Sequence, residues 1–410
     1  MPESTKPPSR CVSLPNPTGW QRLGLMLLAL ALAAAIWLPA IHLLFSPSTR
    51  AVGAEPRMPA LAQQLATRHL RLWTDRELRA RTVARMRVSN AEWDFMGRTF
   101  LVLALANRSL RDPASATSNL QVMDRIIDET LRLEREQGLY FFLMTYAKCG
   151  RWVIDPPRSQ FLDGEIALML ACRCAVADRG DYRTELKRRV EFMIAGMKQS
   201  PVLCVESYPD ECWLFCNTIA LAAIRIHDHI SGEDHRVFLE RWVETARERL
   251  THPETGLLVS SCTVDGTHLD GPEGSSIWMV SHCLQLVDPE LAAAQYARAR
   301  RELGATVCGF GYAREWPASW RGPTDIDSGP IVPVLDVSAG SSGMALVAAA
   351  AFDDGEYLRS LVATLNFAAF PTVNEGGLRF CASNQVGDAV LLYALESGPL
   401  WKKVTRDGRQ

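Results

Sequence analysis

Six times along this 410-residue chain, a short polar or acidic loop leads directly into a segment of small and apolar residues. The apolar segments begin near positions 95, 165, 213, 275, 342 and 385, and charged segments lie between them. A buried helix is apolar on all sides, whereas a surface helix carries one apolar stripe. The alternation predicts an all-α fold, an (α/α)6 toroid or barrel with its polar loops at one mouth. An irregular helical bundle or solenoid is the alternative.

The segments between the apolar helices show the periodicity of surface helices. Apolar residues recur at helical spacing over 183–198, 237–250 and 288–303, and a fourth such segment covers 356–370. The pair Asp288-Pro289 supplies an N-cap and a first-turn proline for the third segment. Strand signals are sparse, and residues 256–264 are the one stretch that suggests a short hairpin.

An uncharged stretch near the N-terminus is long enough to cross a membrane. Leu23 to Phe45 carries no charged residue and is interrupted only by Pro39, and about 20 residues suffice for a transmembrane helix. The basic residues on its two sides, weakly biased toward the N-terminal one, favour a single-pass protein with its main body on the periplasmic or extracytoplasmic side. A cleaved signal peptide ending near Ala54 is the competing interpretation.

Composition divides the chain into a short N-terminal part and one large domain. We expect a disordered segment over 1–22, the transmembrane anchor over 23–45, a linker over 46–60, one helical domain over 61–400 and a tail over 401–410. Eleven cysteines without regular spacing suggest no disulfide framework and favour a reducing compartment, against the charge bias of the anchor.

Charge and motifs exclude several classes of function. The net charge of −2 gives no basis for nucleic-acid binding, and the chain lacks the glycine-rich and nucleophile motifs of nucleotide-binding proteins and hydrolases. His227 and His229 lie two residues apart, which places them on different faces of a helix. We therefore expect no cofactor and no metal. Homo-oligomerisation is left open.

The polar loops supply the candidate chemistry because helix starts should bring them to one mouth. Their acids are Asp94, Asp163, Glu165, Asp210, Glu211, Asp270, Glu273, Asp325 and Asp327. Each acid alone is explained by helix capping, but aromatic residues accompany them, as in a small-molecule pocket. The candidate binding residues are Ser207, Tyr208, Trp213, Trp278, Tyr312, Arg314 and Asp325. The segment 309–330 contributes several of these from an irregular, glycine- and proline-rich stretch.

The stretch SYPDECWLFCNTIALAAIRIHD, from Ser207, resembles the middle of the linalool dehydratase/isomerase family. That family has a Cys-Glu-Pro-Asp segment and then a second cysteine followed by asparagine. The matching positions here are Ser207, Tyr208, Pro209, Asp210, Cys216 and Asn217. Weaker similarity extends over residues 90–397, including IDPPRSQFLDGEIALML and VDPELAAAQYARAR.

The resemblance implies an (α/α)6 domain that adds, removes or relocates water on an isoprenoid alcohol without a cofactor. Cys216 matches the family's second cysteine, whereas Ser207 stands in place of the first and Glu165 in place of a histidine. Asp94 is assigned to the pocket from its position before the first apolar helix. These departures indicate a substrate other than linalool.

We therefore expect a membrane-anchored, cofactor-independent lyase or isomerase acting on a small hydrophobic, isoprenoid-like (terpenoid) alcohol. Dehydration needs an acid for the leaving hydroxyl and a base for a neighbouring carbon-bound proton. Glu165 is the expected acid because its apolar surroundings raise a carboxyl pKa, and Asp210 or Asp327 is the expected base. Cys216 would assist by proton transfer or covalent attack. The alternatives are a carbohydrate-active toroid (glycosidase, lyase or epimerase) and a non-catalytic, membrane-tethered binding platform.

Overall fold

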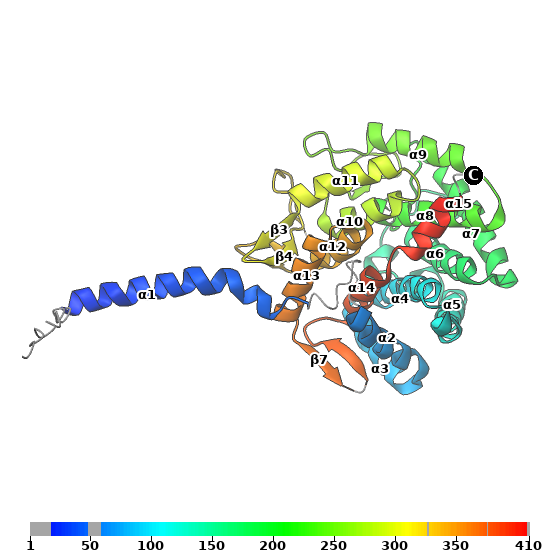
Figure 1. Cartoon of the computed structure of the whole chain (residues 1–410). Coiled ribbons are helices and arrows are strands. Elements are labelled where there is room, and N and C mark those ends of the chain that lie inside the picture. The colour runs from blue at the N-terminus through cyan, green and yellow to red at the C-terminus, as the bar shows by residue number, and fades with distance from the viewer. Residues whose placement is uncertain (1–17, 48–58, 326–327, 375, 408–410) are drawn as a thin grey trace, which may run out of the picture.

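The computed structural model describes residues 18–47, 59–325, 328–374 and 376–407. The expected disordered segment, except for its last residues, and most of the expected linker lie outside the described residues, as does Asp327. Within the described residues the chain is mainly helical, with short strands between some of the helices (Figure 1).

Six largely buried helices follow the expected apolar segments. They are α4 (Ala91–Arg111), α6 (Gln160–Val176), α8 (Leu214–Ser231), α10 (Gly274–Leu284), α12 (Ala339–Ala351) and α14 (Gln385–Glu396). Each packs against the next in this order, and α14 packs against α4. The six helices therefore form a closed ring, as the alternation of segments predicted.

Neighbouring helices of the ring contact one another at matching distances from their starts. Thr99 of α4 meets Glu165 of α6, and Trp278 of α10 meets Ser341 of α12. Parallel packing of this kind places the six N-terminal ends, with their preceding loops, at one end of the ring. At the other end, α15 (Pro399–Asp407) packs against α4 and α8, and its buried Trp401 donates a hydrogen bond to the carbonyl of His282. The residues expected to form a tail therefore belong largely to this helix.

Outer helices, most of them amphipathic, surround the ring. They are α2 (Pro59–Thr74), α3 (Arg76–Ser89), α5 (Ala116–Gln137), α7 (Gly180–Met197), α9 (Arg236–Arg249), α11 (Pro289–Glu302) and α13 (Gly355–Ala368). In α5 the buried residues include Val122, Ile126 and Thr130, spaced four apart along one face. The expected outer segments over 183–198, 237–250, 288–303 and 356–370 correspond to α7, α9, α11 and α13 within a few residues.

Short strands occupy several loops at the N-terminal end of the ring. β1 (Cys212–Trp213) pairs with β2 (Ser261–Cys262), and β7 (Pro371–Asn374) pairs with β8 (Gly377–Phe380). A four-stranded sheet has the order β3 (Gly304–Val307), β4 (Phe310–Ala313), β6 (Val337–Ser338), β5 (Ile331–Val332). The hairpin expected over 256–264 is therefore wrong, because the strand there has two residues and pairs with β1.

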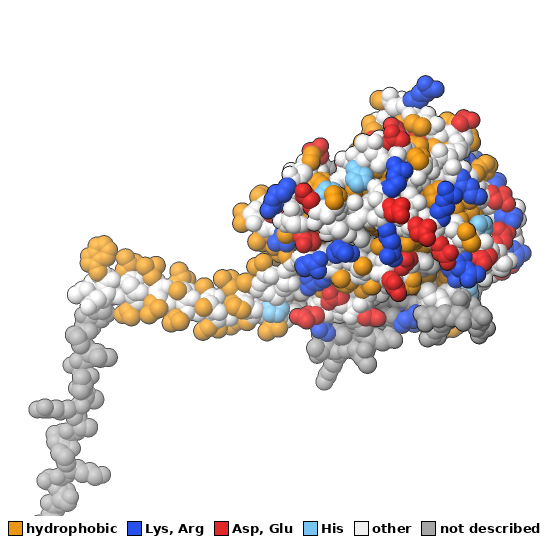
Figure 2. All heavy atoms as spheres, turned by 90° about the horizontal axis from the view of Figure 1, so that it is seen from above, with side chains coloured by type: hydrophobic (Ala, Val, Ile, Leu, Met, Phe, Trp, Pro, Cys, Tyr) orange, Lys and Arg blue, Asp and Glu red, His pale blue; other side chains and the backbone are white. Residues whose placement is uncertain are grey.

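The N-terminal helix α1 (Gly19–Ala40) projects from the body of the molecule (Figure 1). Together with the 3₁₀ helix Ile41–Leu44, it is the one helix of the described residues long and apolar enough to span a membrane, and none of its apolar window is buried. Figure 2 shows apolar side chains along its whole length. Such a helix near an N-terminus is a candidate membrane span or signal sequence.

Candidate functional site

Glu165 lies in the second turn of α6 and is 1 % exposed. The hydroxyl of Thr99 donates a 2.5 Å hydrogen bond to its Oε2 atom, whereas Oε1 has no hydrogen-bond partner among the described residues. Burial raises the pKa of this carboxyl to about 8; the Thr99 hydrogen bond lowers it and the nearby Glu92 carboxylate raises it further. At neutral pH Glu165 is therefore mostly a neutral acid, able to donate a proton.

Gly164 brings α8 close to this acid. A Cβ atom at position 164 would lie 3.2 Å from the carbonyl oxygen of Cys216 and 3.4 Å from the side chain of Ala220. A larger residue would therefore push α6 and α8 apart. The close packing places Cys216, in the first turn of α8, near the carboxyl of Glu165.

Cys216 and Ser207 form the next part of the site. Both are buried, and burial raises the pKa of the Cys216 thiol, with the neighbouring Ser207 hydroxyl lowering it and the carboxylates of Glu165 and Glu92 raising it. The Ser207 hydroxyl makes no hydrogen bond to another oxygen or nitrogen of the described residues. Cys216 is therefore a neutral thiol, suited to positioning a substrate rather than to attack as a thiolate.

The loop before α8 is held rigidly by a buried carboxylate. Glu206 accepts hydrogen bonds from the amides of Val153, Ile154 and Asp210. Asp210 has a φ of 57°, and this left-handed residue closes the turn in which Tyr208 pairs with Glu211. The turn fixes Ser207 and Tyr208 at the end of the ring where α6 begins.

Tyr208 links this loop to α4. Its hydroxyl donates a short hydrogen bond to Oε1 of Glu92, accepts one of 2.9 Å from the amide of Met144, and its ring stacks on Tyr146 at 4.6 Å. Glu92 is half-buried, in contrast to the fully buried Glu165. We define the site cluster as Glu92, Thr99, Glu165, Ser207, Tyr208 and Cys216.

The site cluster pairs two carboxyl groups in different environments. Glu165 is fully buried and mostly protonated at pH 7, because burial raises its pKa to about 8, whereas Glu92 is half-buried and accepts a hydrogen bond from Tyr208. The buried side-chain amide of Gln160, at the start of α6, also donates no hydrogen bond among the described residues. This arrangement can give a proton at one point and accept one at another.

Three of the predicted acids lie elsewhere or have other partners. Asp94 is buried, but Arg98 and Arg87 bind its two oxygens at 2.9 and 3.3 Å. Asp210 is exposed and accepts a hydrogen bond from the amide of Val264 at 3.1 Å. Asp325 is exposed. None of these three is placed with Glu165 and Cys216 by a contact in the structure.

The predicted aromatic and cationic residues serve mainly in packing. Trp278 is fully buried and donates to Ser341 at 3.0 Å. Tyr312 is buried in β4, with Arg314 over its ring at 5.9 Å. Trp213 is half-buried and donates to Glu211 at 3.3 Å. Of the predicted binding residues, the structure brings Ser207 and Tyr208 to the site cluster.

Sequence reasoning missed Glu92 and Thr99. The two residues are seven apart on α4 and so lie on the same face of the helix, the face toward Glu165. Asp94, which was chosen instead, is four residues before Arg98 and pairs with it on another face. The seven-residue spacing would have indicated that Glu92, rather than Asp94, shares a helix face with Thr99.

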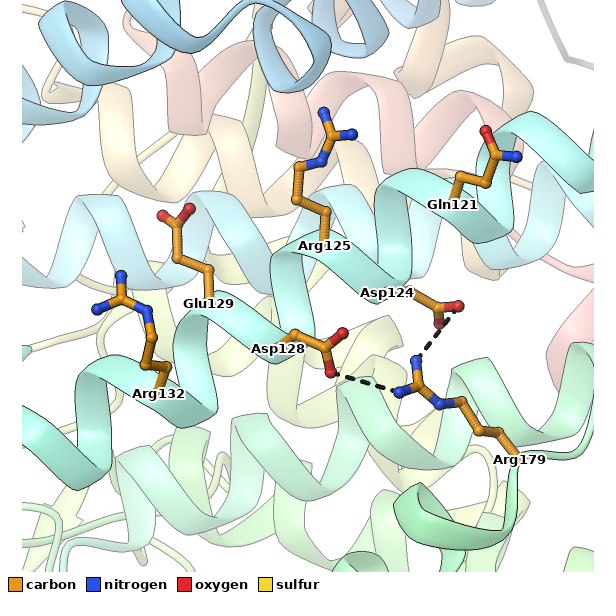
Figure 3. Close-up of a pocket in the computed structure, with 7 residues that line it drawn as sticks. All are labelled: Gln121, Asp124, Arg125, Asp128, Glu129, Arg132 and Arg179. Carbon is orange, nitrogen blue, oxygen red and sulfur yellow. Dashed lines mark ion pairs between the residues drawn. The ribbon is translucent and has the colours of Figure 1, made fainter.

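A surface hollow of about 660 Å³ lies beside the outer helix α5, and no residue of the site cluster lines it (Figure 3). Its lining residues are Gln121, Asp124, Arg125, Asp128, Glu129, Arg132 and Arg179. Arg179 forms ion pairs with Asp124 and Asp128 at 3.4 and 3.7 Å. A charged, ion-paired hollow of this kind does not suit an apolar substrate.

Comparison with known proteins identifies the family of the chain. No curated protein matches the chain. Two solved structures are similar to it: the GH76 α-mannanase BT2949 of Bacteroides thetaiotaomicron (13 % identity, 76 % of this chain and 87 % of that one, TM-score 0.47) and the GH76A α-1,6-mannanase of Salegentibacter sp. HEL1_6 (11 %, 75 % and 88 %, 0.46). Neither score supports an argument about this chain. The family model described as linalool dehydratase/isomerase matches residues 165–386, more than half of the chain, from Glu165 to the start of α14. The chain therefore belongs to the linalool dehydratase/isomerase family.

Proposed function

We propose that this protein is a membrane-anchored, cofactor-independent lyase or isomerase that removes or relocates water on a hydrophobic, isoprenoid-like alcohol. Its closed ring and outer helices constitute an (α/α)6 toroid, and the site cluster at the N-terminal end of the ring is the active site. Family membership supports a dehydratase/isomerase type of reaction. The side of the membrane on which the domain lies is proposed to be extracytoplasmic.

The observation that carries the proposal is the state of Glu165. One of its oxygens is held by Thr99 and the other has no partner among the described residues, in a setting that raises its pKa to about 8. A buried polar atom without a partner is uncommon in a folded protein and needs an explanation. The explanation that we propose is a substrate hydroxyl, which would accept a hydrogen bond from the protonated Oε1 atom of Glu165.

The dehydration step uses the two carboxyl groups of the site cluster in different roles. Glu165 gives its proton to the hydroxyl of the substrate, so that the C–O bond breaks and water leaves. Glu92 removes a proton from the neighbouring carbon, and the electron pair of that C–H bond forms the alkene. Isomerisation follows when water returns to another carbon and the protons move in reverse. General acid or base catalysis by one such group accelerates a reaction by a factor of about 10² to 10⁴.

The neutral groups of the site position the alcohol. The thiol of Cys216 and the hydroxyl of Ser207 lie side by side and present weakly polar atoms that can contact a substrate oxygen. The helices around them are buried and apolar, and a small hydrophobic substrate suits such walls. The anchor α1 keeps the enzyme at the membrane in which such alcohols dissolve.

The test is isotope exchange catalysed by the full chain in detergent micelles. A panel of isoprenoid alcohols is incubated in H₂¹⁸O, and label incorporation is followed by mass spectrometry. We expect the parent protein to label at least one alcohol and Glu165→Gln to label it about 10² to 10⁴ times more slowly. Glu136→Gln, which alters an exposed ion pair on α5, is the matched control and should retain the parental rate.

Two results would count against the proposal. One is a folded Glu165→Gln protein that exchanges label at the rate of the parent. The other is an absence of exchange with all alcohols, accompanied by hydrolysis of an oligosaccharide, which would favour the carbohydrate alternative.

A further inference from the structure

A second group of buried polar atoms lies at the opposite end of the ring, where α8 ends and α9 begins. His227 and Asp228 lie near the C-terminal end of α8, and His235 is the N-cap residue of α9. One ligand atom from each of the three residues lies within 4.8 Å of the other two. The sequence comparison of His227 with His229 overlooked His235, which the turn between the helices brings back to Asp228.

Within this group the imidazole of His227 has no hydrogen-bond partner among the described residues. Nδ1 of His235 lies 2.6 Å from Oδ1 of Asp228, and Nδ1 of His227 lies 3.8 Å from the same oxygen. His227 is 1 % exposed, and neither of its ring nitrogens has a hydrogen-bond partner among the described residues. Buried side-chain nitrogens usually have a partner. The His227 ring is therefore a ligand-like group directed at a carboxylate and a second imidazole.

We propose that His227, Asp228 and His235 bind a divalent transition-metal ion of the Zn²⁺ class, with solvent completing the coordination. Two imidazoles and one carboxylate form a donor set that Zn²⁺ accepts. In a tetrahedral site with metal–ligand bonds of about 2.0 to 2.1 Å, the donor atoms lie roughly 3.4 Å apart. In the structure Oδ1 of Asp228 lies 2.6 Å from Nδ1 of His235 and 3.8 Å from Nδ1 of His227. The side chain of His235 is 25 % exposed, so an ion can reach the site from solvent.

The electrostatic setting favours a cation. The site lies at the C-terminal end of α8, where the helix dipole is negative. The carboxylate of Glu233, which pairs with Lys187 at 2.5 Å, lies near both imidazoles. The metal would join the end of an inner helix to the start of an outer one. Because the site lies at the far end of the ring from Glu165, its role is structural and separate from the proposed reaction.

The test uses Co²⁺ as a spectroscopic probe on the full chain in micelles after treatment with a chelator. We expect one equivalent to bind with the visible absorption of nitrogen and oxygen ligands, and Zn²⁺ to raise the thermal unfolding temperature. His235→Ala should weaken binding at least tenfold and remove the thermal shift. His252→Ala, which removes a ring that lies tilted against Trp320 with the ring centroids 4.9 Å apart, is the control and should bind like the parent.

Equal binding by the parent and His235→Ala would overturn the assignment. So would a thiolate-to-cobalt absorption band, because the buried cysteines would then be the ligands. Isotope exchange on the alcohols does not depend on this site, so loss of the metal proposal leaves the proposed function to its own test.

A different observation carries a second inference, which depends on α1 being the proposed membrane anchor. Where α1 meets the body, Phe45 packs on Phe367 of α13 at 5.1 Å, and Phe310 of β4 packs on Phe367 at the same distance. The hairpins β3–β4 and β7–β8 and the end of α13 lie on the side of the body from which α1 projects (Figure 1).

Exposed apolar side chains surround this point of attachment. Val307, Phe367, Phe370 and Val373 are 42, 50, 66 and 61 % exposed; we call these four residues the apolar rim. We infer that the apolar rim rests in the surface of the bilayer into which α1 inserts. The hairpins lead into α12 and α14, so the rim and the site cluster share one end of the ring. A hydrophobic substrate would then have a short path from lipid to the active site.

Fluorophore quenching in nanodiscs tests this contact. Cys308, exposed in the turn of β3–β4, is labelled in a chain whose Cys11, Cys149 and Cys381 are replaced by serine. We expect spin-labelled lipid to quench this probe at least twice as strongly as a probe at Asp234→Cys, at the other end of the ring. Adding Phe370→Asp and Val373→Asp should reduce the quenching. Equal quenching at both positions would overturn the membrane contact.

Discussion

Glu165 and Asp94 occupy similar places in the sequence but have opposite surroundings in the fold. Both are buried carboxyl groups near the start of an inner helix, preceded by a polar loop. Arg98 and Arg87 bind both oxygens of Asp94, whereas Glu165 has one hydrogen bond from Thr99 and no ion pair within the described part of the chain. A buried acid with arginine partners stabilises the fold, and one without them keeps its proton. The partners of each acid, rather than its position in the sequence, distinguish Asp94 from Glu165, the proposed catalytic acid.

The largest expected effect is the loss of stability on removing the paired acid. Asp94→Ala leaves the guanidinium of Arg98, which is 2 % exposed, with Glu129 as its remaining carboxylate partner. Breaking a buried ion pair costs about 3 to 5 kcal/mol. Denaturant unfolding in micelles should show a loss in this range, against less than about 0.5 kcal/mol for the exposed control Glu136→Gln. An equally small loss for Asp94→Ala would remove the distinction between the two acids.

The raised pKa of Glu165 should make the stability of the protein depend on pH. The folded-state pKa of Glu165 is about 8, against an ordinary value of 4.5, so between these values only the folded state holds the proton. Stability is fully present below pH 4.5 and is lost as pH rises toward 8, by roughly 1.4 kcal/mol per pH unit. Relative to Glu165→Gln, the parent should lose about 3 kcal/mol between pH 5.5 and 7.5. Parallel pH profiles for the two proteins would show that Glu165 is ionised in the fold.

The ring of helices could be predicted from the sequence because buried helices are apolar on all sides and differ in composition from surface helices. Inner helices predicted near 165, 213 and 385 begin at Gln160, Leu214 and Gln385. The hairpins β3–β4 and β7–β8 left no such record, because each strand has only four residues. The turn of the first hairpin depends on Gly309, which has a φ of 83°. A single glycine in a sequence is not enough to predict a turn.

The site was predictable in part. The apolar neighbours of Glu165 indicated a raised pKa, and the family resemblance drew attention to Ser207 and Cys216. Asp210 could not be assigned, because a left-handed turn directs its carboxylate to the amide of Val264. Such turning of one side chain depends on contacts between loops far apart in the chain.

Removing the one hydrogen bond to Glu165 should have an intermediate effect. Thr99→Val deletes the donor that lowers the pKa of Glu165, so the pKa should rise and the alkaline fall in turnover should move to higher pH. The lost hydrogen bond should cost about 1 kcal/mol of stability. Thr245→Val, which loses a hydroxyl on the exposed face of α9, is the matched control. A fall in turnover that stays at the parental pH would show that Thr99 does not act on the proposed catalytic acid.

The smallest effect is expected for Asp325, an acid predicted from the same pattern of polar loops. It is exposed, and no ion pair within the described part of the chain involves it. Substitutions at such surface positions change stability by less than about 0.5 kcal/mol. Asp325→Asn should therefore unfold like the parent and exchange isotope at the parental rate, in contrast to both Asp94→Ala and Glu165→Gln. A large loss of exchange without a loss of stability would mean that Asp325 takes part in the reaction and would contradict its assignment as a surface residue.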